Sequence, residues 1–104
     1  MHAIEAGQKV KIPVHLLGGP FPDQVLAMIR FDGKDVSGVL SASEIVDRDG
    51  TSGFVRAEVL EVSGSTVKLA VPKGLSAGTF SRSGKATLPL AWAEANLVAD
   101  TEAR

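Results

Sequence analysis

Apolar and polar residues alternate along the segment 9–16, and this period of two is the feature that most constrains the fold. The segment reads K-V-K-I-P-V-H-L, with valine, isoleucine and leucine at every second position and lysine or histidine between them. Successive side chains of a strand point to opposite faces of a sheet, whereas an amphipathic helix repeats its apolar residues three and four positions apart. The segment is therefore predicted to be a strand with one buried face. Pro13 cannot donate to a sheet ladder, which predicts an edge strand or a bulged one.

Similar short segments follow, separated by turn residues. Strands are predicted over 24–32, 36–41, 54–62, 67–71, 79–82, 85–90 and 96–99. Asp32-Gly33 is the strongest hairpin signal, because both turn positions tolerate a positive φ. The apolar parity changes midway through 54–62, which predicts a β-bulge or a sharp bend.

Single helical turns are predicted at 43–45 and 91–95, and residues 100–104 are expected to fray. With 104 residues the chain has the length of one ordinary domain, so 1–104 is predicted to fold as a unit. Six to eight short strands with one or two helical turns are typical of an all-β protein. The predicted architecture is a small SH3-like barrel, with a compact β-sandwich as the alternative.

Two stretches of the second half resemble SH3-like barrels. They are the hairpin V-R-A-E-V-L-E-V-S-G-S-T-V-K-L-A-V and the ending K-A-T-L-P-L-A-W-A-E-A-N-L-V. The ending is similar to the last strand and helical turn of the C-terminal domain of ribosome-maturation factors of the RimP type. The resemblance covers residues 54–99 and implies a barrel fold, whereas function does not follow from a shared barrel.

Composition excludes several classes of chemistry. The chain has no cysteine, so disulfides, thiolate metal ligands and thiol catalysis are excluded. Charged and polar residues interrupt the first eleven positions, and no run of 18 apolar residues occurs, so neither a signal peptide nor a membrane span is expected. The expected location is cytoplasmic. The net charge of −1 gives the whole molecule no attraction to nucleic acid or lipid.

Charge is nevertheless uneven along the chain, because residues 63–93 contain four cations and no acid. The candidate binding residues of this basic segment 68–85 are Lys68, Lys73, Phe80, Arg82 and Lys85. A cationic face with one stacking aromatic is the combination that nucleic-acid-binding barrels use. The alternative is an ordinary solvated surface, on which acids from elsewhere in the chain lie beside the lysines.

Two aromatic residues are also singled out. Phe21 lies between two prolines in a loop, where it is either a lid over the barrel end or an exposed anchor for a partner. Trp92 is the only tryptophan, and it is interpreted as a core plug that closes the barrel.

No catalytic, metal or cofactor-binding residue is predicted. His15 shares its strand face with lysines and is interpreted as a solvated residue, because a catalytic base needs an orienting partner and a nearby nucleophile. Residues 47–53 slightly resemble a calcium loop, but a turn is the better interpretation.

The leading functional hypothesis is a non-enzymatic binding module that acts through its surface on a protein partner. That partner can be a second copy, since segment 25–31 is apolar on both faces. The first alternative is a nucleic-acid- or ribosome-associated barrel that uses the basic segment. The second is a small ligand-binding protein or enzyme with its site near His15.

Overall fold

The chain folds into short antiparallel strands with little helix. The computed structural model describes residues 4–18, 21–31, 34–72 and 84–100. Its elements are β1 (Lys9–Gly18), β2 (Gln24–Phe31), β3 (Lys34–Ser41), the 3-10 turn η1 (Ala42–Glu44), β4 (Ile45–Asp49), β5 (Ser52–Ser63), β6 (Thr66–Ala70), β7 (Lys85–Pro89), α1 (Leu90–Asn96) and β8 (Val98–Ala99). The all-β prediction and both predicted helical turns are confirmed. The strand predicted at 79–82 lies outside the described residues.

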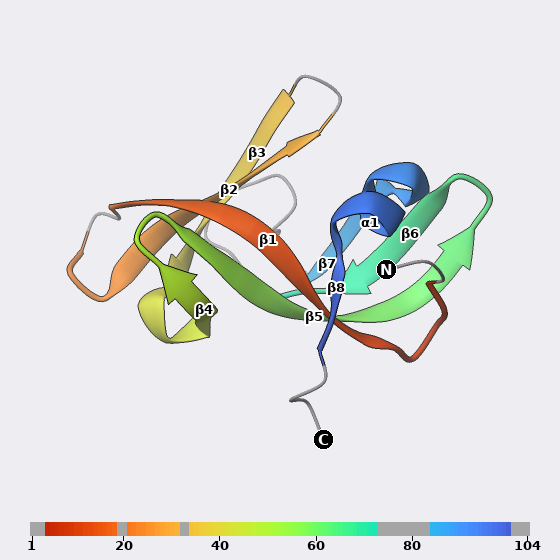
Figure 1. Ribbon diagram of the computed structural model, residues 1–104, viewed down its shortest axis with the longest axis horizontal. Helices are drawn as coiled ribbons and strands as arrows, with labels where there is room; N and C mark the ends of the chain where they lie inside the picture. The colour runs from red at the N-terminus through yellow and green to blue at the C-terminus, as the bar shows by residue number, and fades with distance from the viewer. Residues whose placement is uncertain (1–3, 19–20, 32–33, 73–83, 101–104) are drawn as a thin grey trace.

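The strands form one curled sheet with the order β3-β2-β1-β5-β6-β7, to which β4 and β8 are added beside β5 and β1. Long, curved β1 and β5 run through its middle, and α1 lies between the diverging β2–β3 and β5–β6 hairpins (Figure 1). Within the described chain, β3 and β7 are the two ends of this order and do not pair with each other. The sheet is therefore a curled half-barrel.

Strand β1 is central, so the prediction of an edge strand is wrong. One edge of β1 pairs with β5 from Lys9 to His15. The other edge pairs first with β8, at Val10 and Lys11, and then with β2, from His15 onwards. Along this second edge, Pro13 lies between the two pairings and has no paired strand among the described residues. We call this gap, between Lys11 and His15, the break.

The direction of the backbone groups explains why proline is tolerated in a central strand. The Lys9 carbonyl accepts the Asp100 N–H at 3.0 Å on the β8 side, whereas the Leu16 N–H donates to the Thr51 carbonyl at 2.7 Å on the β5 side. Backbone groups alternate in direction along a strand. The nitrogen of Pro13 therefore faces the break, where its missing hydrogen removes no ladder bond.

The hairpin and bulge predictions are confirmed. Phe31 pairs with Lys34, so β2 and β3 form an antiparallel hairpin, whereas the predicted turn residues Asp32 and Gly33 lie outside the described residues. In β5 the register shifts between Val59 and Glu61 against β6. Leu60 is the extra residue, and this bulge accounts for the change of parity within the segment. Bulges bend a strand and increase its twist, as the curled sheet requires.

The core lies on the concave, inner face of the sheet. Its buried residues come from the inward positions of the strands and from the α1 region: Val10, Ile12, Val14, Leu16, Val25, Ala27, Ile29, Leu40, Val55, Ala57, Val59, Val67, Leu69, Val71, Ala86, Leu88, Ala93 and Leu97. Trp92 is only partly buried and packs against this cluster. It therefore contributes to the core as a partly buried residue at its border.

The end of the described chain is fixed to β1 by Asp100. Its side chain is 1% exposed and lies 3.2 Å from the Nε of Arg56, which is 50% exposed. Its backbone N–H donates to Lys9 as described above. The expectation that fraying begins at residue 100 is therefore wrong for Asp100, whereas residues 101–104 lie outside the described structure.

Gly53 on β5 allows the close approach of neighbouring side chains. A Cβ at this position would lie 2.6 Å from Cγ2 of Ile45 and 3.1 Å from Cδ1 of Leu16. We expect Gly53→Ala to destabilise the fold by about 1–3 kcal/mol, because the β-branched Ile45 has little rotamer freedom with which to move away. Urea unfolding measures the change. Gly18→Ala is the matched control, since nothing lies within 4 Å of its Cβ position. Equal midpoints for the two variants would contradict the prediction.

Two ion pairs, Arg56–Asp100 and Lys9–Glu58, differ in burial and should therefore differ in their contribution to stability. Arg56→Met leaves the buried carboxylate of Asp100 without this cation, and we expect a loss of about 1–3 kcal/mol. Lys9→Met removes a cation that is 53% exposed from Glu58, which is 40% exposed, and should cost no more than about 0.5 kcal/mol. Thermal unfolding of both variants at low salt tests this order. A larger loss in Lys9→Met would contradict the role given to Asp100.

Candidate functional site

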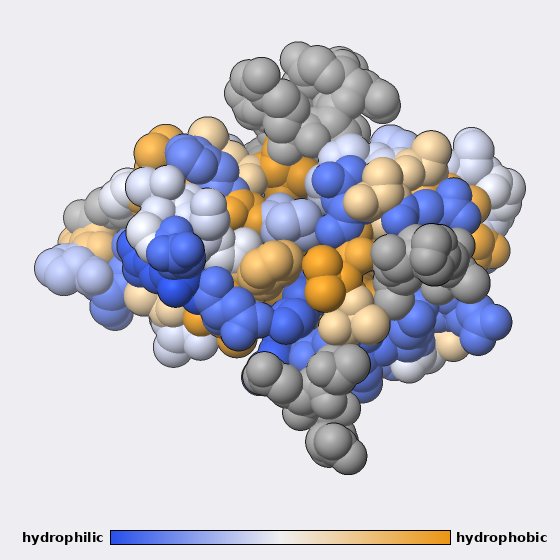
Figure 2. All heavy atoms as spheres, in the orientation of Figure 1, coloured by the Kyte–Doolittle hydropathy of each residue, from blue (hydrophilic) through white to orange (hydrophobic). Residues whose placement is uncertain are grey.

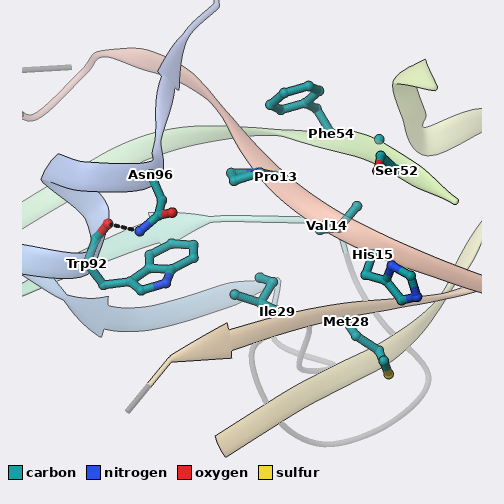
Figure 3. A pocket seen from close by; sticks show the side chains of 10 residues that line it. Pro13, Val14, His15, Met28, Ile29, Ser52, Phe54, Trp92 and Asn96 are labelled. Atoms are coloured by element: carbon teal, nitrogen blue, oxygen red, sulfur yellow. Dashed lines mark hydrogen bonds between the residues drawn. The ribbon is translucent and has the colours of Figure 1, made fainter. Parts of the chain in front are cut away.

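A cleft opens at the break, between α1 and the strands β1, β2 and β5. Its volume is about 340 Å³. The lining residues are Pro13, Val14, His15, Met28, Ile29, Ser52, Gly53, Phe54, Trp92 and Asn96. In Figure 3 the indole of Trp92 and the amide of Asn96 project from α1 toward the strand side of the cleft. The cleft therefore brings together residues that are up to 83 positions apart (96 − 13) in the sequence.

The polar groups of the cleft have defined roles. The Nδ2 of Asn96 donates to the Trp92 carbonyl at 2.9 Å, one helical turn earlier (Figure 3). This bond uses one of the two N–H groups of the amide, whose second N–H and Oδ1 remain as a donor and an acceptor. His15 is exposed on the outer face of β1, as the sequence predicted. No aspartate, glutamate, lysine or arginine is among the described residues that line the cleft.

The register places a serine beside His15 but does not build a hydrolytic triad. Ser52 lies directly opposite His15, and Asp49 lies opposite Ser52 on the far side. A serine nucleophile needs histidine in the middle, with the carboxylate orienting the histidine. Here serine occupies the middle position, and no hydrogen bond joins His15 to Ser52 in the described structure. The arrangement therefore lacks the order that nucleophilic catalysis requires.

Phe21 lies at the end of the sheet, next to a second cavity of about 440 Å³. Phe21 is 62% exposed. The same cavity is lined by Gln24 and Arg48. Within the described chain, the buried Oε1 of Gln24 has no hydrogen-bond partner. Arg48 donates from Nε to the Gly50 carbonyl at 3.3 Å. Binding by Phe21 remains a prediction.

Only part of the basic segment can be placed. Lys68 and Lys85 are exposed on β6 and β7, at outward positions of the sheet. Glu61 of β5 lies directly opposite Lys68, so an acid from outside the segment adjoins the cations. The other three candidates, Lys73, Phe80 and Arg82, lie outside the described residues.

The outer face around the first half of β1 is charged. Lys9 bonds Glu58, and Lys11 bonds Asp47 at 2.6 Å. The Lys11 ammonium also lies 5.5 Å from the centre of the Phe54 ring. These contacts pair opposite charges across β1, β4 and β5, and they leave this half of the face polar.

A short apolar row crosses the outer face at the end of β1. Leu17 of β1 lies opposite Leu26 of β2, and Leu26 lies opposite Val39 of β3. Leu17 is 44% exposed, and the other two side chains are half-buried. We call Leu17, Leu26 and Val39 the apolar row. The neighbouring register position on β2 carries Met28, which is also half-buried.

Sequence reasoning identified the two apolar faces of β2 but not Leu17, Val39 or Asn96. The apolar row depends on register across three strands, and local patterns do not reveal that register. Exposed apolar residues also occur elsewhere, for example Val98 on β8, which is 42% exposed. In Figure 2 apolar residues lie mainly toward the centre of the visible side, over β1 and β8, with hydrophilic residues around them.

No group of three or more potential metal-ligating side chains occurs among the residues that the structure describes. In the same part of the chain, no helix has the length and hydropathy needed to cross a bilayer.

Comparisons of the chain with models of protein families, with curated proteins and with solved structures each found no match.

Proposed function

We propose that this chain is a non-enzymatic binding module that associates with a second copy of itself through the apolar row. The carrying observation is the register of Leu17, Leu26 and Val39, which aligns three aliphatic side chains across the outer face. Removing such a face from water lowers the free energy by about 25 cal/mol for each Å² of apolar surface that is buried. The charged half of the same face offers no such gain.

The geometry of the row suits a two-fold contact. In a symmetric dimer the same patch meets itself, so Leu26, the middle residue, would pack on its own counterpart. Leu17 would then face Val39 of the second copy, and Val39 would face Leu17. The three side chains are aliphatic, so this arrangement brings no charges together. The contact would also bury the second, outward apolar face of β2.

The proposal includes an SH3-like closure of the barrel and the absence of catalysis. The curled half-barrel and the helical turn before the last strand support an SH3-like arrangement. The order Asp49–Ser52–His15 supports a non-enzymatic role, because the register neighbours of His15 are Ser52 and Met28, and neither is a carboxylate.

The nucleic-acid alternative stays a prediction. It rests on the basic segment, of which Lys68 adjoins Glu61 in register. Binding of single-stranded RNA at about 50 mM salt that weakens steeply as salt is added would favour this alternative over self-association.

Size-exclusion chromatography with light scattering tests the proposal over a range of concentrations. We expect the mass to rise toward that of a dimer as the protein is concentrated. Leu17→Ser should weaken the dimer about ten-fold or more, because each copy loses apolar contact area. Leu60→Ser is the matched control, since Leu60 is 39% exposed and lies outside the row. A monomeric mass at every concentration, or equal effects of the two variants, would refute self-association through the row.

A further inference from the structure

The cleft at the break is a second candidate site, independent of the apolar row. None of Leu17, Leu26 and Val39 lines it. We propose that the cleft binds a small, planar, uncharged ligand that carries an N–H donor, such as a heteroaromatic amide. The volume of about 340 Å³ lies at the small end of the range known for ligand pockets.

The requirement for a neutral ligand follows from the lining. The described side chains that line it include no carboxylate, ammonium or guanidinium group. A charged ligand would lose hydration there without meeting an opposite charge from these side chains. Lys11, which lies beside Phe54, is already paired with Asp47 at 2.6 Å and offers no unopposed charge nearby.

The requirement for a donor follows from Pro13 and Asn96. At the break, the β1 backbone has a carbonyl but no N–H, because the residue there is proline. The amide of Asn96 uses one of its two N–H groups on the Trp92 carbonyl, so its Oδ1 and its second N–H are left for a ligand. The cleft therefore offers a ligand two acceptors, the Pro13 carbonyl and Oδ1, together with one N–H donor. A peptide strand fits this edge poorly, since strand addition needs donors and acceptors in alternation.

The requirement for a planar ligand follows from the walls. Trp92 and Phe54 bring aromatic surfaces to the cleft, and Met28 adds a polarisable thioether. Flat rings gain from offset stacking on such surfaces and from contact with sulfur. Figure 3 shows the indole on one side of the cleft with Met28 and His15 across from it.

Trp92 makes the test direct, because it is the only tryptophan of the chain and lines the cleft. The probes are nicotinamide, which is neutral, nicotinate, which is an anion, and 1-methylnicotinamide, which is a cation. All three share one ring. We expect a saturable change of Trp92 fluorescence with nicotinamide, and binding at least about five-fold weaker for the two ions. Non-saturating changes of equal size with all three probes would overturn the proposal.

The variant Asn96→Asp tests recognition by charge. It keeps an oxygen at the position of Oδ1 and adds a negative charge, but it loses the bond from Nδ2 to the Trp92 carbonyl, so circular dichroism first checks that it is folded. We expect it to reverse the preference and bind 1-methylnicotinamide more tightly than nicotinamide. Glu61→Gln, outside the cleft, should leave the order of the probes unchanged. An unchanged order in a folded Asn96→Asp protein would refute the role of Asn96.

A third variant keeps this inference distinct from self-association. Leu17→Ser, which tests the apolar row, should bind nicotinamide as the wild type does. Loss of nicotinamide binding in Leu17→Ser would show that the cleft and the row act as one site.

Discussion

The pairing of β1 with β5 is the interaction on which the rest of the molecule depends. The two strands share seven paired positions, from Lys9–Glu58 to His15–Ser52. Their inward residues form the centre of the core, and every other strand of the described sheet is reached through one of them. A long central pair of this kind fixes which side of each strand is buried, because a shift by one residue would expose the whole apolar set.

Two irregularities then shape the half-barrel around this pair. The bulge at Leu60 bends β5 toward β6, and the break at Pro13 lets β1 exchange β8 for β2 along its other edge. Such irregularities add local bending to the regular twist of a sheet. The break also creates the cleft, since the space left between β8 and β2 is bounded by α1. The break at Pro13 thus both shapes the sheet and opens the candidate site.

The outward side chains of β1 lie in two different environments. Outward positions early in β1 carry Lys9 and Lys11, which are paired with acids of other strands. The last outward position, Leu17, instead begins the apolar row. Burial of the inner face is the same throughout, so stability does not require this contrast. The proposed self-association would bury only the aliphatic part of this surface and leave the paired charges in water.

Sequence by itself determined the local features of this protein: the period of two, the Asp32-Gly33 hairpin, the bulge in 54–62 and the helical turns at 43–45 and 91–95. Each of these follows from neighbouring residues, whose backbone preferences and alternation act over a few positions. Tertiary structure alone decided that β1 is central, that Asp100 is buried and that Glu61 adjoins Lys68. It also decided the cleft and the apolar row. These depend on which strands pair and in which register, and that choice is made by the burial of the whole core rather than by any short segment.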